Sequence, residues 1–143
     1  MPRATLACLV VLVGCSDVRD FRGTWRGPSV GSAAVLRVNI SPGASATLAI
    51  SQIDTYGMQG TLTVDGLVQD APLTSLDSAE ADVLSTMSWS GSPLHNYVGF
   101  VTIPDGKGDA LALVALYDDH RVEVRVLRGG PSPLYGIFAL EAS

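Results

Sequence analysis

The sequence predicts an all-β domain, folded as a single antiparallel up-and-down β-barrel of about eight to ten short strands. Strand-like runs rich in Val, Ile, Leu and Thr recur along the chain, separated by Gly, Pro, Asp and Ser. No stretch shows the period of an amphipathic helix. A barrel also removes the exposed strand edges that a long antiparallel sheet would leave open to aggregation. A two-sheet sandwich is the alternative architecture.

The order of the expected strands follows from these runs. They are residues 21–26, 34–40, 46–53, 60–64, 72–76, 82–89, 97–103, 110–117, 121–127 and 134–140. Clusters of turn-forming residues lie between them at 41–43, 65–66, 90–93, 104–106 and 129–131. No linker is long enough to divide the chain, so one barrel domain is expected over residues 21–143.

Two runs carry the clearest burial patterns. In the run 121–127, valine alternates with a charged residue. This period of two predicts a strand with one buried face and one wet face, the wet face bearing Arg121, Glu123 and Arg125. The run 110–116 is apolar throughout, which predicts a strand covered on both faces.

Composition argues against several classes of protein. The chain has 143 residues and a net charge of −5, with Lys107 as its one lysine, which argues against a nucleic-acid partner. Charged residues make up 16% of the sequence and hydrophobic residues 47%, so a disordered chain is not expected. No apolar run reaches the roughly 18 residues that a membrane-spanning helix needs.

The first fifteen residues have the pattern of a secretory signal. One positive residue, Arg3, precedes the uncharged and mostly apolar stretch 4–13, and the small residue Gly14 and then Cys15 follow. Ten residues in a helix span only about 15 Å, half of the hydrocarbon core of a bilayer. We therefore expect the segment to be removed, whereas the alternative is a buried first element with Cys15 in the core.

The end of this segment resembles a known processing motif. Leu12-Val13-Gly14-Cys15 is similar to the lipobox of bacterial lipoproteins. The resemblance implies cleavage between Gly14 and Cys15, a diacylglyceryl group on the Cys15 thiol and acylation of the new amino terminus. Ser16, where an aspartate would favour the inner membrane, implies an outer-membrane location in the bacterial cell envelope.

The resemblance also implies a division of the chain. Residues 1–14 form the signal peptide, residues 15–20 hold the lipidated cysteine and a short tether, and residues 21–143 form the barrel. The two cysteines are Cys8 and Cys15. Loss of the first and lipidation of the second would leave the mature domain no thiol for a disulfide, a metal or catalysis.

A second motif resembles the entry of small β-barrels. Gly23-Thr24-Trp25 is similar to the Gly-x-Trp that opens lipocalins and avidins, where the indole plugs one barrel end under a basic residue. The resemblance implies this plug role for Gly23 and Trp25, with Arg125 or Arg128 lying over the indole. Because Tyr56, Trp89 and Tyr97 flank expected loops, they are candidates for the rim of a pocket mouth.

The polar groups form no catalytic constellation. Asp118, Asp119 and His120 could form a small metal site or an acid–base pair, but a hairpin turn explains them better. In the stretch 105–109, Lys107 occupies the middle of the alternate positions that would hold calcium, which favours a glycine-rich hairpin. His95 is expected in a solvated loop. We therefore predict no metal and no cofactor.

Three functions remain at this point. The first is a non-enzymatic, lipid-anchored envelope domain that binds a protein partner, because an anchor raises the effective concentration at a surface. The second is a carrier or sensor of a small apolar ligand in the barrel. The third is an unrecognised envelope hydrolase, which would require clustered acids in one cleft.

Overall fold

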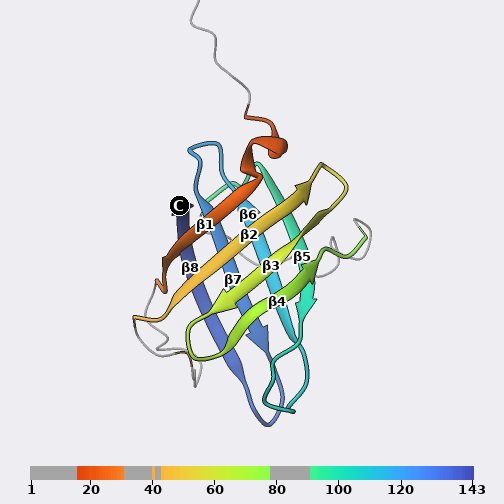
Figure 1. Ribbon diagram of the computed structural model, residues 1–143, viewed down its shortest axis with the longest axis vertical. Helices are drawn as coiled ribbons and strands as arrows, with labels where there is room; N and C mark the ends of the chain where they lie inside the picture. The colour runs from red at the N-terminus through yellow and green to blue at the C-terminus, as the bar shows by residue number, and fades with distance from the viewer. Residues whose placement is uncertain (1–15, 31–39, 41–42, 78–90) are drawn as a thin grey trace, which may run out of the picture.

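The computed structural model describes residues 16–30, 40, 43–77 and 91–143. The described residues form one short 3-10 helix and eight strands (Figure 1). These are η1 (Val18–Phe21), β1 (Gly23–Pro28), β2 (Ser45–Ile53), β3 (Met58–Val64), β4 (Val68–Thr74), β5 (His95–Val101), β6 (Ala110–Leu116), β7 (Val122–Arg128) and β8 (Leu134–Ala142). Within this part of the chain, no helix has the length and apolar character needed to cross a membrane.

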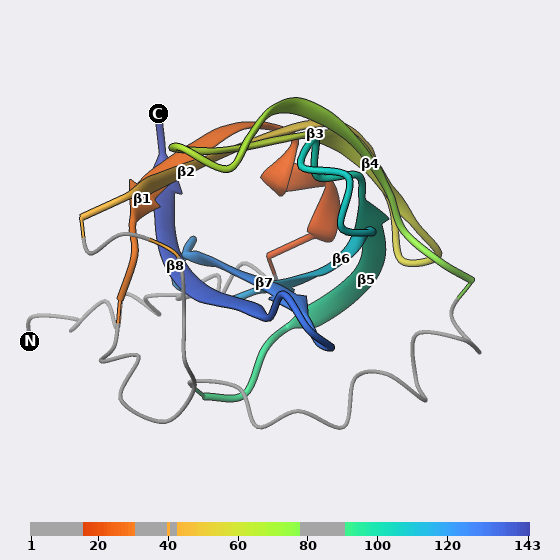
Figure 2. The ribbon, with the colours of Figure 1, turned by 90° about the horizontal axis from the view of Figure 1, so that it is seen from below.

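The strands form a single antiparallel sheet that curls into a nearly closed barrel, which confirms the predicted fold. The order in the sheet is β4-β3-β2-β1-β8-β7-β6-β5, so neighbours in the sequence are neighbours in the sheet, and β1 joins β8. Figure 2, seen along the barrel, shows the ring of strands, through which η1 is seen at the end of the barrel that is uppermost in Figure 1. The predicted strands 34–40 and 82–89 lie outside the described residues, apart from Ile40.

The two contacts that close the ring differ in extent. On one side, β1 pairs with β8 through Trp25 and Ala142 and through Arg26 and Glu141. On the other side, β4 and β5 meet near one end, where an isolated bridge joins Ser75 to Gly99. Gly99 permits this approach, because a Cβ there would lie 2.6 Å from the Thr74 carbonyl oxygen. The β4–β5 seam is therefore the least hydrogen-bonded join among the described strands.

The helix η1 departs from the prediction of a tether over residues 15–20. Asp17 and Asp20 form a capping box, in which the Asp17 carboxylate accepts the Arg19 N–H at 3.0 Å. The Asp20 carboxylate in turn accepts the Asp17 N–H at 3.2 Å. Val18 and Phe21 are buried in the core. The chain is thus packed on the barrel from Val18 onward, and β1 begins two residues later than predicted.

Large apolar side chains fill the described interior of the barrel. Alternate residues of each strand point inward, and the largest fully buried ones are Phe21, Phe138, Leu48, Met58, Leu62, Leu73, Leu116 and Leu140. They come from η1 and from β2, β3, β4, β6 and β8, so both halves of the ring contribute to one core.

Part of the outer face of β5, β6 and β7 is also buried, which the sequence predicted only for β6. Val98 and Leu113 form a second apolar cluster outside the main core. Next to it, Glu123 and Arg125 are only 5% and 6% exposed. The prediction of a wet face on β7 is therefore wrong at these two residues, whereas the prediction that β6 is covered on both faces is confirmed.

Candidate functional site

Trp25 fills the barrel end at which the chain enters. We call this the η1 end; it comprises η1, the β2–β3 hairpin at 54–57 and the β6–β7 hairpin at 117–121. The Trp25 indole N–H donates to the Phe21 carbonyl oxygen at 2.8 Å, and the two rings stack at 5.3 Å. The His120 ring lies 5.6 Å from Phe21. A helix and an indole thus occupy this end of the interior.

Gly23 starts the strand that carries this tryptophan. Its φ of +136° is a conformation that residues with a side chain rarely adopt. The glycine allows the chain to turn from η1 into β1, which directs Trp25 into the core. Gly23 and Trp25 therefore both lie at the η1 end of the barrel.

The two arginines expected over the indole lie elsewhere. Arg128 pairs in register with Leu134 at the start of β8, whereas Trp25 pairs with Ala142 at its end. Arg128 is therefore at the opposite end of the barrel. Arg125 lies on the outer face of β7, while Trp25 points into the interior. The structure brings neither arginine to Trp25.

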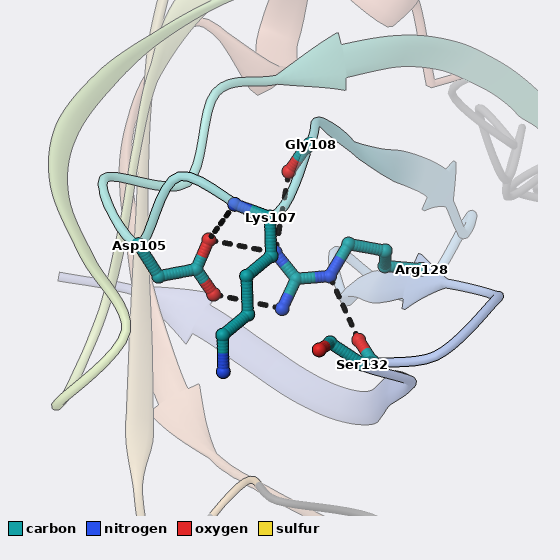
Figure 3. Close-up of polar contacts among 5 residues, drawn as sticks. All are labelled: Asp105, Lys107, Gly108, Arg128 and Ser132. Carbon is teal, nitrogen blue, oxygen red and sulfur yellow. Dashed lines mark hydrogen bonds and ion pairs between the residues drawn. The ribbon is translucent and has the colours of Figure 1, made fainter.

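Arg128 instead ties two hairpins together at the opposite end, which we call the far end (Figure 3). Its guanidinium donates to both carboxylate oxygens of Asp105, at 3.0 and 2.8 Å. It also donates to the carbonyl oxygens of Gly108, at 3.2 Å, and Ser132, at 2.9 Å. Asp105 also accepts the Lys107 N–H at 3.0 Å. The stretch 105–109 is therefore a hairpin held by contacts within itself and by the Arg128 guanidinium.

The acid sensitivity of this contact gives a first prediction. The Arg128 guanidinium, helped by the Lys107 N–H, lowers the pKa of the Asp105 carboxyl to about 2. An unfolded aspartate has a pKa of about 3.9, so the contact stabilises the fold above roughly pH 4 and is lost as the pH falls toward 2. We expect Asp105→Asn to lower the melting temperature at pH 7, with the difference from wild type shrinking between about pH 4 and pH 2. Thermal unfolding followed by circular dichroism checks this; a difference that stays constant down to pH 2 would contradict it.

Of the predicted rim residues, Tyr56 lies in the β2–β3 hairpin, Tyr97 contacts that hairpin, and Trp89 lies outside the described residues. The Tyr97 hydroxyl donates to the Asp54 carbonyl oxygen at 2.6 Å, and burial raises its pKa. Tyr56 is 82% exposed at the tip of the hairpin. The hairpin borders an open hollow of about 290 Å³ lined by Gln52, Ile53, Asp54, Tyr56, Gly57, Met58, Gln59, Thr74 and Ser75. Tyr97 therefore braces the hairpin, and Tyr56 projects from it.

The residues 118–120 form the tight turn between β6 and β7. His120 has a φ of +57°, and its N–H donates to the Tyr117 carbonyl oxygen at 3.1 Å. The Ser16 hydroxyl donates to the Asp118 carbonyl oxygen at 3.4 Å, which brings the entering chain to this turn. Among the described residues, no group of three His, Cys, Asp or Glu side chains could hold a metal ion.

A buried polar cluster on the outer wall was not anticipated. Glu123 and Arg125 form an ion pair at 2.6 Å, and the Tyr117 hydroxyl donates to Glu123 at 3.3 Å. Burial, and next the charge of Glu123, raise the pKa of Tyr117. These residues lie on one strand and in the turn that precedes it, so the cluster ties the turn to the wall.

The resemblance at the amino terminus concerns Gly14 and Cys15, which lie outside the described residues. Comparisons with family models, with curated proteins and with solved structures gave no match to this chain.

Proposed function

We propose that this protein is a lipid-anchored domain of the bacterial cell envelope, at the outer membrane, whose barrel binds a protein partner and catalyses no reaction. The lipobox-like sequence ending at Cys15 supports the anchor. The observation that carries the proposal is the seating of the chain directly after it: Ser16 contacts the β6–β7 turn and Val18 is already buried. A lipid on the residue that directly precedes Ser16 in the sequence would hold the domain close to a surface.

The large side chains buried in the described interior support a role for the outer surface over a role for a cavity. Phe21, Leu48, Met58 and Phe138 are among the fully buried side chains of the core. A small apolar ligand would have to displace such side chains, each worth several kcal/mol of packing. This favours an interaction module over the lipocalin-like carrier.

The outer wall offers apolar surface for such an interaction. Phe100, Leu111, Leu127 and Tyr135 are direct cross-strand neighbours on β5 to β8. Phe100 is 49% exposed, and the other three are partly exposed. An apolar row of this kind on a surface is typical of contacts with other proteins.

Intact mass spectrometry of the protein purified from bacterial membranes tests the anchor. We expect loss of residues 1–14 and added mass for a diacylglyceryl group and an acyl chain. The Cys15→Ser variant should show neither change, because it lacks the thiol that forms the thioether. A wild-type protein that retains residues 1–14 with a free thiol would refute the anchor.

Two further measurements separate the interaction module from the carrier. Photo-crosslinking in cells, with the crosslinker at Phe100 and a matched control at exposed Thr74 on the β4 outer face, should capture an envelope protein through position 100. Native mass spectrometry should show the barrel without a bound small molecule. A retained lipid inside the barrel, together with no crosslinked protein, would favour the carrier.

A further inference from the structure

We infer that the η1 end of the barrel faces the membrane and rests on the lipid headgroups, while the far end with Arg128 and Asp105 points away from it. This inference rests on the proposed lipidation of Cys15. It adds which surface of the domain meets the lipid and why that surface is fixed.

The seating of the entering chain sets the orientation. The Ser16 hydroxyl contacts the Asp118 carbonyl oxygen, and the next residue, Asp17, caps η1. Val18 and Phe21 then anchor that helix in the core. Consecutive Cα atoms of a chain are about 3.8 Å apart, and Cys15 directly precedes Ser16 in the sequence. A lipid on its sulfur therefore has almost no free tether between itself and the η1 end.

The membrane position of the lipid then determines the position of the barrel. Acyl chains partition into the bilayer core at roughly 0.8 kcal/mol per buried methylene, which leaves the glycerol and its thioether at headgroup level. Ser16, which follows the lipidated cysteine in the sequence, contacts the β6–β7 turn, so that turn and η1 must lie at the same level. The far end is separated from them by the full length of the seven-residue strands, such as β6 and β7, which is about 20 Å.

The side chains exposed at the η1 end suit a headgroup environment. Tyr56 projects from the β2–β3 hairpin. Leu94 is 41% exposed and lies at the same end, because its N–H donates to the Leu116 carbonyl oxygen at the end of β6. A tyrosine, with its apolar ring and polar tip, is favoured at the membrane–water interface. These two residues give the η1 end apolar contact points.

Attraction between the charges of the η1 end and anionic lipid does not explain the orientation. The salt dependence of the contact is therefore a second readout in the test. Among the described residues of the η1 end, acidic side chains outnumber basic ones: Asp17, Asp20, Asp54, Asp118, Asp119 and Glu141 against Arg19, Arg22, Arg26 and Arg121. Attraction to anionic lipid would need the opposite balance. The covalent tether must therefore hold this end at the surface, and the contact should persist when salt screens charges.

Depth-dependent fluorescence quenching tests the orientation. The lipidated protein is reconstituted in phosphatidylethanolamine vesicles that contain a lipid with a nitroxide on its headgroup. Single cysteines replace exposed residues at the two ends, Tyr56→Cys at the η1 end and Lys107→Cys at the far end, and carry the same fluorophore. We expect at least a several-fold stronger quenching at position 56 than at position 107, unchanged between low and high salt.

The outcomes distinguish this inference from the proposed function. Intact mass is measured on the same samples before labelling. Lipidated protein with equal quenching at both positions, or with stronger quenching at position 107, overturns the orientation and leaves the anchor standing. Protein that carries no lipid refutes the anchor itself, and with it the basis of the orientation. Far-UV circular dichroism establishes that both labelled variants keep the wild-type fold.

Discussion

Replacing Gly27 by alanine is expected to remove at least about 3 kcal/mol from the free energy of unfolding, although it adds only one methyl group. Gly27 lies in β1 where that strand crosses β8. A Cβ at this position would overlap the carbonyl oxygen of Ala139. That atom belongs to the backbone of β8 and cannot move away by changing a rotamer. The two strands would have to separate at the join that closes the ring.

Gly129 provides the matched control. An added Cβ there meets no atom within 4 Å, so Gly129→Ala should change the free energy of unfolding by no more than about 0.5 kcal/mol. Urea unfolding of both variants, followed by tryptophan fluorescence and circular dichroism, measures the difference. Similar midpoints for the two variants would show that the β1–β8 crossing tolerates a side chain. That result would contradict the close approach of β1 to the β8 backbone.

Glu123→Ala is expected to remove roughly 3–5 kcal/mol, the second large effect. The substitution takes from buried Arg125 its ion-pair partner at 2.6 Å and from the Tyr117 hydroxyl its acceptor. The buried guanidinium would still carry the free-energy cost of its desolvation. It would no longer have the attraction of this carboxylate to offset that cost. The loss should therefore greatly exceed that of an exposed pair.

The exposed pair in the neighbouring turn is a suitable comparison. Asp119 and Arg121 are also 2.6 Å apart, but their side chains are 52% and 47% exposed. Water already solvates both charges, so Asp119→Ala should barely move the midpoint of urea unfolding. Replacing Glu123 and Arg125 together by leucine and methionine should restore much of the stability lost in Glu123→Ala. Equal midpoints for the two single variants would contradict the burial of the Glu123–Arg125 pair.

The strands could be predicted because their signals are local. Alternating valines and the Asp-Gly and Gly-Gly turns mark β2, β3, β6, β7 and β8 to within about two residues. The helix η1 was missed, although Asp17 and Asp20 have the spacing of a capping box. With only four residues, η1 was too short to show a helical period. Its helical form depends on packing of Val18 and Phe21 into the barrel.

The site residues were harder to predict, because their contacts depend on register between strands far apart in the sequence. Trp25 and its place at the barrel entry could be inferred from a local motif. Which arginine lies near it could not, since a shift of one residue moves a side chain to the other face of the sheet. The partner of Arg128, Asp105, is more than twenty positions earlier in the sequence. Only the folded ring brings the two hairpins together.

The pairing of β1 with β8 also affects how the polypeptide can acquire its fold. In the pairing that closes the ring, β1 is hydrogen-bonded to residues 141–142 of β8. The ring therefore cannot close until the last strand has been synthesised. Pairing across such a separation makes folding slow compared with a helical bundle of equal size. A polypeptide exported through a narrow translocation channel would remain unfolded during its passage. The barrel would close only on the far side of the membrane. The same connectivity that completes the barrel would then delay folding until after transport.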